Sequence, residues 1–261
     1  MEATLAQKRN RLFVILSGIF LTNALLAEMI GTKIFSVEQT IGMNPTNLNL
    51  FGFVMDFNLT AGVVIWPIVF ITTDLINEYF GKPGVKRISY LTAGLIAYSF
   101  VIIFIAIKLT PASWWLDAYG TDPEGNKFNI NYAFSRIFGQ GLRIILGSLT
   151  AFLIGQLVDV FVFQKLRHVT GSKALWLRAT GSTLVSQFVD SFVVLFIAFS
   201  GIFSSAQILA IGITNYIYKF SVAILLTPLI YVGHYFIDRY LGKENADRLS
   251  EEASHQSRGF F

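Results

Sequence analysis

The chain has 261 residues, of which 54% are hydrophobic and 14% are charged, and its formal net charge is +4. Soluble domains carry about 25% charged residues, so this composition excludes an ordinary soluble domain and indicates a protein that crosses the membrane several times. The chain also lacks cysteine, which excludes disulfides, thiolate metal sites and cysteine nucleophiles.

Six segments are long and apolar enough to cross a bilayer, since about 20 residues of helix span the hydrocarbon core. In chain order they are 12–31, 62–80, 88–109, 142–163, 178–201 and 207–236. We therefore predict an all-α membrane protein with six transmembrane helices. In this interpretation residues 1–240 form one six-helix transmembrane domain, and residues 241–261 form a cytoplasmic tail.

The positions of lysine and arginine predict the orientation of these helices, because cytoplasmic loops of membrane proteins are enriched in both residues. Most of them lie before the first segment, between the second and third, between the fourth and fifth, and after the sixth. Both termini are therefore predicted to be cytoplasmic. This distribution accounts for the positive net charge, so we predict no nucleic-acid partner. The two long outer gaps, 32–61 and 110–141, are either plain surface loops or lids.

Polar side chains interrupt several of the apolar segments, and many lie three or four residues apart on one helix face. The second segment contains "TDLINEYF", the fourth "GQLVDVFVF" and the fifth "SQFVDSFVV". The first segment adds Asn23 and Glu28. The candidate site residues are Asp74, Asn77, Glu78, Gln156, Asp159, Arg178, Gln187, Asp190, Asn215 and Lys219.

Two interpretations of these residues stay open. They are either structural ion pairs, in which Lys219 pairs with Asp159 or Asp190, or the lining of a substrate path, the default role of ionisable groups in a membrane. Their spread over five of the six segments favours the path. Acids, amides and a lysine supply both acceptors and donors, and nearby aromatic rings suit stacking. The set is typical of a site for a flat polar heterocycle, and it predicts neither a metal nor another cofactor.

Enzyme motifs such as H-E-x-x-H, G-x-S-x-G and the P-loop are absent from the sequence. We therefore predict that the chain is not an enzyme. If it transports a substrate by itself, an ion gradient or trapping of the substrate inside the cell must drive the transport. Its partners are then the lipid bilayer and a small heterocyclic molecule, and a homo-oligomer is compatible with the sequence.

Three stretches resemble the queuosine precursor transporter family, also called the vitamin uptake transporter or VUT family. They are "TDLINEYFGK", "RATGSTLVSQFVDSFVVLFIAF" and "YKFSVAILLTPLIY". The resemblance implies uptake of 7-deazaguanine bases, the precursors of the modified tRNA nucleoside queuosine, across the bacterial inner membrane. By position, the family's polar residues fall on Asp74, Asn77, Glu78, Asp159, Arg178, Gln187, Asp190 and Lys219. The long gap 32–61 and the acidic insertion at 117–127 depart from the family pattern at the outer entrance.

Two alternatives are kept. A vitamin-binding membrane subunit of an energy-coupling-factor transporter also has six helices, but the alanine face by which such subunits dock a partner is not cleanly repeated in "FVILSGIFLTNALLAEMIGTK". Dependence of uptake on a separate ATPase module would support it. A structural or assembly membrane protein with buried ion pairs is the other alternative. It predicts that exchanging the charges of Asp190 and Lys219 preserves both the fold and the phenotype.

Overall fold

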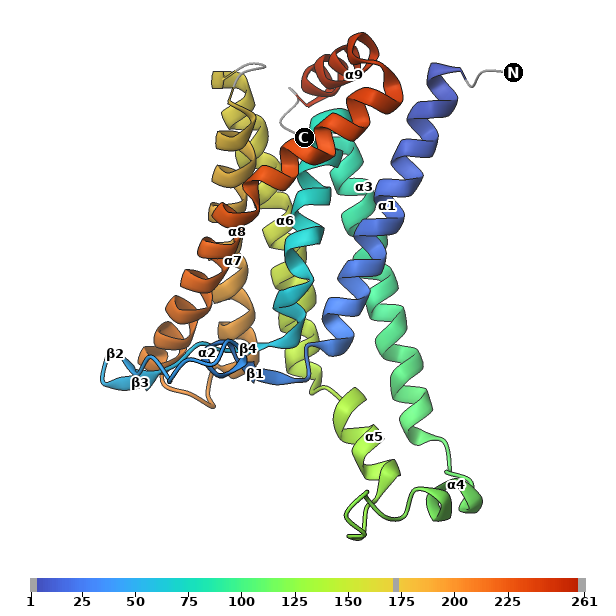
Figure 1. Ribbon diagram of the computed structural model, residues 1–261, viewed down its shortest axis with the longest axis vertical. Coiled ribbons are helices and arrows are strands. Elements are labelled where there is room, and N and C mark those ends of the chain that lie inside the picture. Colours follow the sequence, from blue (N-terminus) through green and yellow to red (C-terminus); the bar gives the residue numbers. More distant parts are fainter. Residues whose placement is uncertain (1–3, 171–173, 258–261) are drawn as a thin grey trace.

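Long helices build the body of the molecule and run roughly along its long dimension (Figure 1). The computed structural model describes residues 4–170 and 174–257. Within these residues, five helical stretches are long and apolar enough to cross a membrane. The helices are α1 (Leu5–Ile30), α3 (Trp66–Lys108), α6 (Leu142–Thr170), α7 (Leu175–Phe199) and α8 (Ser205–Leu241). The prediction of an all-α membrane protein is confirmed.

Helix α3 contains most of the second and third predicted segments, 62–80 and 88–109, and it folds back at Gly81. A straight helix of 43 residues would be roughly 65 Å long, about twice the thickness of the hydrocarbon core. Gly81 has φ 63° and ψ −169°, and the arms before and after it run in opposite directions (Figure 1). A Cβ atom here would lie 2.7 Å from the Ala253 carbonyl oxygen, so only glycine fits this turn.

The end of the bundle where α1 begins, α3 folds back and α8 ends is called the basic end below. Most of the lysine and arginine residues used for the orientation prediction belong to the elements that meet there. Lys8 of α1 donates a hydrogen bond to the Tyr240 carbonyl oxygen of α8 (3.3 Å), and Arg9 lies 3.9 Å from Glu252. The start of α1 and the end of the described chain therefore lie at the same end of the molecule. Which side of the membrane this end faces stays a prediction.

Helix α9 (Lys243–Gln256) folds back over the basic end (Figure 1). Its buried residues Ala246, Leu249 and Ala253 are three and four positions apart, so they form one apolar face. This face packs on α3 and extends the buried core. The described part of the predicted tail 241–261 is therefore a helix packed against the bundle, while the division into a 1–240 domain and a tail stays a prediction.

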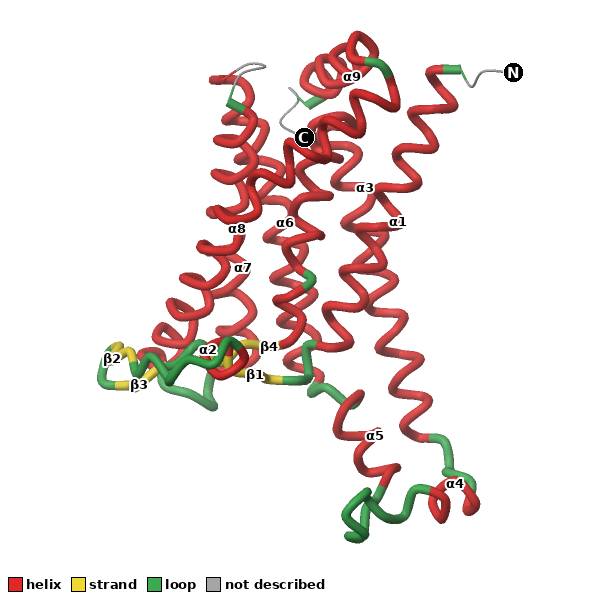
Figure 2. The backbone as a smooth tube through the Cα atoms, in the orientation of Figure 1, coloured by secondary structure: helices red, strands yellow, loops and turns green. Residues whose placement is uncertain are grey.

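The opposite end carries the short elements, visible as the yellow strands and the small helices of Figure 2. Two antiparallel strand pairs fold the gap 32–61: β1 (Ile34–Ser36) with β4 (Asn58–Thr60), and β2 (Leu48–Leu50) with β3 (Phe53–Met55). The short helix α2 (Val37–Thr40) and the 3-10 helix η1 (Ala61–Val64) complete this region. The second outer gap contains α4 (Ser113–Ala118) and α5 (Ile130–Phe138). Both outer gaps are therefore folded, and no lid role is assigned to them.

Glu38 holds the first outer region together, and we expect this region to loosen in acid. Burial opposes the charge of Glu38, but bonds from the Phe57 N–H and from the hydroxyls of Thr46 and Ser36 outweigh it and lower its pKa from 4.5 to about 2. The charged form therefore stabilises the fold above pH 4.5, and this contribution is lost as the pH falls from 4.5 toward 2. Amide hydrogen exchange at Val37 and Phe57, corrected for intrinsic rates, measures the loss.

The matched variant is Glu38→Gln, which removes the titrating group. We expect the amide protection of residues 34–60 in this variant to be lower than in the parent protein at neutral pH. Between pH 6 and pH 3 the protection in the variant should not change with pH. Identical pH profiles for the two proteins would show that Glu38 does not organise this region.

Candidate substrate-binding site

A cavity lies between α3, α7 and α8, within the part of the bundle that carries the predicted polar residues. Its volume is about 40 Å³, which is room for a few water molecules, whereas ligand pockets usually measure roughly 300 Å³ or more. The cavity must widen before it can take a heterocycle. Its polar or aromatic lining residues are Trp66, Phe70, Asp74, Thr180, Thr183, Gln187, Tyr218 and Lys219.

Aromatic rings form one wall of this cavity. Trp66 and Phe70 are one helical turn apart at the start of α3, and their rings stack with centroids 5.8 Å apart and planes inclined by 21°. Both residues line the cavity. Paired flat faces at the edge of a cavity suit a planar ligand, because an aromatic ring gains contact area and favourable geometry by offset stacking.

Lys219 and Asp190 form an ion pair that links α8 to α7. The Lys219 ammonium donates to Asp190 Oδ2 at 2.7 Å, and the side chains are 17% and 24% exposed. This is one of the two pairings that the sequence left open. Because Lys219 also lines the cavity, the pair places a charge at its wall while each partner offsets the other's charge.

Two acceptor atoms at the cavity have no donor among the described residues. They are Asp74 Oδ1 and Gln187 Oε1, and each residue is only 2% exposed. Buried polar atoms in folded proteins are almost always hydrogen-bonded, since an unsatisfied one costs about 1–3 kcal/mol. The cavity is therefore suited to a ligand that presents N–H or O–H groups to Asp74 and Gln187.

Gln156 and Asp159 lie on α6, beside the cavity residues but not in its lining. Gln156 Oε1 accepts bonds from the hydroxyls of Thr73 (3.3 Å) and Ser89 (3.5 Å), which belong to the two arms of α3. Asp159 Oδ1 accepts a bond from Ser186 of α7 (3.1 Å). The second oxygen of Asp159 has no partner among the described residues. Gln156 thus supports the α3 fold, whereas Asp159 keeps one unused acceptor.

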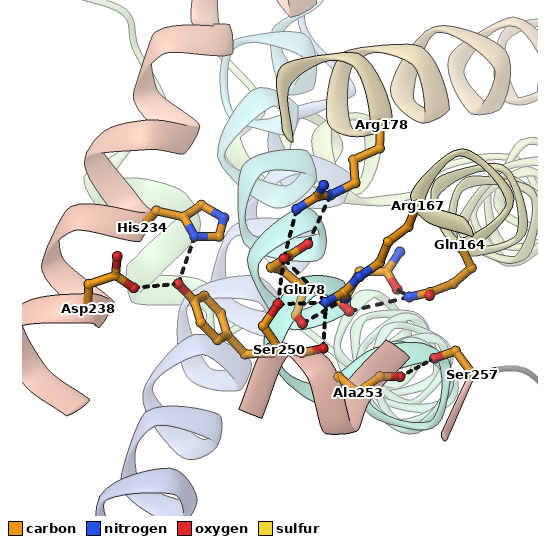
Figure 3. Close-up of polar contacts among 11 residues, drawn as sticks. Glu78, Gln164, Arg167, Arg178, His234, Asp238, Ser250, Ala253 and Ser257 are labelled. Carbon is orange, nitrogen blue, oxygen red and sulfur yellow. Dashed lines mark hydrogen bonds and ion pairs between the residues drawn. The ribbon is translucent and has the colours of Figure 1, made fainter. Parts of the chain in front are cut away.

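Glu78 and Arg178 bind each other at the basic end, as Figure 3 shows. Arg178 donates from Nε (3.1 Å) and Nη2 (2.8 Å) to the two carboxylate oxygens of Glu78. The Ser250 hydroxyl of α9 donates to Glu78 Oε1 at 2.8 Å. Arg167 of α6 lies 3.4 Å from the same oxygen and donates to the Glu78 carbonyl oxygen at 3.0 Å. Glu78 therefore joins α3 to α6, α7 and α9.

The two predicted asparagines have different surroundings. Asn77 is fully buried and accepts a 2.6 Å bond from Gln164 Nε2, while its own Nδ2 has no partner among the described residues. Asn215 lies one turn before Lys219 on α8, is only partly buried and does not line the cavity. The structure thus brings Asp74, Gln187, Lys219 and Asp190 together and separates Glu78, Arg178 and Asn215 from them.

Sequence reasoning missed several residues at the basic end. Arg167 lies between the fourth and fifth predicted segments, where the sequence indicates only a basic loop. In the structure it is 6% exposed and donates to the Ser250 hydroxyl at 2.6 Å. The Tyr79 hydroxyl lies 2.7 Å from His234 Nδ1 and donates to Asp238 at 3.0 Å (Figure 3). The spacing of His234 and Asp238 on one helix face was the only signal in the sequence.

Among the described residues, no group of three or more His, Asp or Glu side chains is placed to hold a metal ion.

Comparison with known proteins identifies the family. A family model described as "Putative vitamin uptake transporter" matches residues 60–233. The chain belongs to this family. It is 35% identical over 191 residues to the "Probable queuosine precursor transporter" of Bacillus subtilis (strain 168), covering 72% of this chain and 77% of that protein. It is 30% identical over 178 residues to the "Queuosine precursor transporter" of Escherichia coli (strain K12), covering 66% and 71%. No solved structure matches the chain.

As a member of the vitamin uptake transporter family, the protein is a multi-pass protein of the bacterial inner membrane. The resemblance drawn from the three sequence stretches is confirmed. The matched range 60–233 includes every predicted site residue and the whole cavity lining. It ends before α9, so the contact of Ser250 with Glu78 reaches beyond the range that the family model covers.

Proposed function

We propose that this transporter imports queuosine precursors, the 7-deazaguanine bases, across the bacterial inner membrane. One observation carries the proposal: two buried acceptors that find no donor in residues 4–170 and 174–257, Asp74 and Gln187, line a cavity beside Lys219 and stacked aromatic rings. The pyrimidine edge of a guanine-like base presents adjacent N–H donors and a carbonyl acceptor. The N–H donors of the base match the acceptors of Asp74 and Gln187, and its carbonyl oxygen matches the ammonium donor of Lys219. The relatives named queuosine precursor transporters support the same substrate class.

In this proposal the base lies flat against Trp66 and Phe70, and its N–H groups face Asp74 and Gln187. Lys219 approaches the carbonyl oxygen while Asp190 holds the ammonium in place. Asn77, Gln156 and Asp159 lie outside the cavity lining and support this arrangement, and Asn215 lies one turn before Lys219 without touching the base. Glu78 with Arg178 closes the basic end. The cavity of about 40 Å³ represents a closed state, and α3 and α8 must separate to admit the base.

We further propose six membrane crossings with both termini in the cytoplasm. The fold-back of α3 at Gly81 and the gathering of basic residues at one end support this topology. The transmembrane domain then spans residues 1–240, and 241–261 is a cytoplasmic segment. The protein acts as a transporter without enzymatic activity, and a gradient or intracellular trapping drives it.

The experiment that tests the function is thermal stabilisation of the purified protein by 7-deazaguanine bases, since a ligand that binds the folded state raises its melting temperature. Guanine, adenine and a vitamin such as riboflavin are the comparison ligands. Stabilisation by the 7-deazaguanine bases alone supports the proposal. Stabilisation by the vitamin, together with uptake that requires an added ATPase module, would support the energy-coupling-factor alternative instead.

Gln187→Leu separates binding from folding. Gln187 Oε1 has no partner in the described protein, so we expect leucine to leave the melting temperature of the free protein unchanged or raised. Binding of a 7-deazaguanine base should weaken about tenfold or more, because its N–H donor would lose an acceptor. The matched control is Gln164→Leu, which removes the bond to Asn77 (2.6 Å) and should lower stability without changing affinity. Unchanged affinity in Gln187→Leu would remove this residue from the site.

A further inference from the structure

We propose that a groove at the basic end binds the phosphate headgroup of an anionic phospholipid. The groove lies between α1, the fold-back of α3 and α9, and its volume is about 630 Å³. It is called the arginine groove below, after Arg9, Arg87 and Arg248 in its lining. Among the described residues it shares no lining residue with the substrate cavity. The inference therefore goes beyond the proposed function and does not depend on it.

The charged side chains of the arginine groove are mostly positive. Among the described residues, the charged members of its lining are Arg9 of α1, Arg87 of α3, and Arg248 and Glu252 of α9. Three positive charges and one negative charge leave a net charge of +2. Arginine suits a phosphate group, because its planar guanidinium presents several N–H donors in a fixed fork. Three helices thus supply guanidinium groups to one hollow.

These guanidinium groups keep N–H donors for a ligand. Arg9 and Arg248 lie 3.9 Å and 3.1 Å from the Glu252 carboxylate, and the three side chains are 36%, 72% and 40% exposed. Glu252 therefore offsets part of the charge, while all three groups stay open to solvent. Arg87 is exposed, and its side chain has no hydrogen bond or ion pair with any described residue. Its guanidinium is available to a phosphate oxygen.

Apolar side chains complete the lining of the arginine groove. The rings of Phe13 and Phe80 have centroids 4.9 Å apart, and the Arg9 guanidinium lies 6.0 Å from the centre of the Phe80 ring. Other apolar lining residues are Leu5, Pro83 and Leu249. A phospholipid presents both a charged phosphate and an adjoining apolar part, whereas a free phosphate ion has no use for the apolar surface. The composition of the groove therefore favours a lipid.

The position of the groove along the helices also favours a lipid. Arg9 precedes the first predicted membrane segment, and Phe13 lies inside it. Phe80 ends the second predicted segment, and Arg87 immediately precedes the third. The groove therefore lies where these helices leave the hydrocarbon core, which is the depth of the phospholipid headgroups. Basic pockets between transmembrane helices on the cytoplasmic side, where this end is predicted to lie, bind the headgroups of anionic lipids.

The test measures the melting temperature of the full-length protein in a neutral detergent as phosphatidylglycerol is added. A ligand that binds the folded state raises this temperature. We expect saturable stabilisation by phosphatidylglycerol and much less by zwitterionic phosphatidylcholine with the same acyl chains. Inorganic phosphate should stabilise no more than sodium chloride at the same ionic strength. Equal stabilisation by the two lipids, or stabilisation by inorganic phosphate as large as that by phosphatidylglycerol, would overturn the proposal.

Two variants with opposite expected effects separate lipid binding from folding. Arg87→Gln removes a guanidinium without a partner among the described residues, so the melting temperature without lipid should stay unchanged. Its affinity for phosphatidylglycerol should fall about fivefold at low salt, the effect of one basic residue near an anionic surface. Glu252→Gln removes the acid that competes with the phosphate for Arg9 and Arg248. Its affinity should rise by a similar factor.

The matched control is Arg11→Gln. Arg11 is an exposed residue of α1 that does not line the arginine groove, so this variant removes the same charge from the same end of the protein. Its affinity for phosphatidylglycerol should equal that of the parent. A loss as large as in Arg87→Gln would show that overall charge, and not the groove, attracts the lipid, and unchanged affinity in both groove variants would also refute the site. Because substrate uptake is not measured, neither result touches the proposed function.

Discussion

Replacing Glu78 with glutamine should lower the free energy of unfolding by about 3–5 kcal/mol, the cost of removing one partner from a buried ion pair. Glu78, Arg178 and Arg167 are 4%, 2% and 6% exposed. Without the carboxylate charge, two buried guanidinium groups lose their counter-charge, and a single oxygen remains to accept from Arg178 and Ser250. The melting temperature in detergent should therefore fall by roughly 2–4 °C for each kcal/mol.

The matched control for Glu78→Gln is Glu252→Gln on α9. Glu252 pairs with Arg248 at 3.1 Å, but the two side chains are 40% and 72% exposed. Exposed pairs contribute about 0–1 kcal/mol, so this variant should unfold almost like the parent. If Glu78→Gln proved as stable as Glu252→Gln, the ion-pair cluster would not hold the basic end together, and a direct role of Glu78 in binding would become the better interpretation.

Two variants of the ion pair between Lys219 and Asp190 should separate a binding role from a structural role, and the first removes only the charge of Lys219. Lys219→Gln alone leaves Asp190 without its 2.7 Å partner, and losing one member of a hydrogen-bonded charge pair at a binding site costs about 2–5 kcal/mol. We expect affinity for a 7-deazaguanine base to fall between roughly 30-fold and several thousand-fold. Isothermal binding and liposome uptake measure the effect.

The double variant Lys219→Asp with Asp190→Lys restores the pair with reversed positions. We expect it to recover most of the stability of the parent protein but not the uptake, because the ammonium no longer faces the substrate at the same place. Normal uptake by this variant would favour a purely structural pair and would count against the proposed site.

The sequence was sufficient for the features that depend on local periodicity and charge. The apolar runs predicted each long helix, and the two runs around Gly81 predicted that α3 is not a single straight crossing. Polar residues three and four positions apart correctly indicated that Asp74 and Asn77 share a helix with Glu78, and Lys219 pairs with one of its two predicted partners.

The features that depend on packing between distant helices could not be predicted. Glu78 and Arg178 are 100 positions apart, and nothing in their local sequence says that they meet rather than face a substrate. Arg167 looked like a surface cation because it follows a membrane span, yet α9 covers it. The small volume of the cavity depends on the relative positions of α3, α7 and α8, which spacing along one helix does not determine.

The contact between Glu78 and residues late in the chain has a consequence for biogenesis. Glu78 enters the membrane with the early helices, but Arg178 is synthesised 100 residues later and Ser250 172 residues later. At about 5–20 residues per second, the nascent chain must hold an unmatched acid for several seconds or longer. Its place next to the fold-back at Gly81 keeps that acid near the membrane surface during this interval. Any nascent chain cut before Arg167, which lies 89 residues after Glu78, therefore keeps this carboxylate without a basic partner.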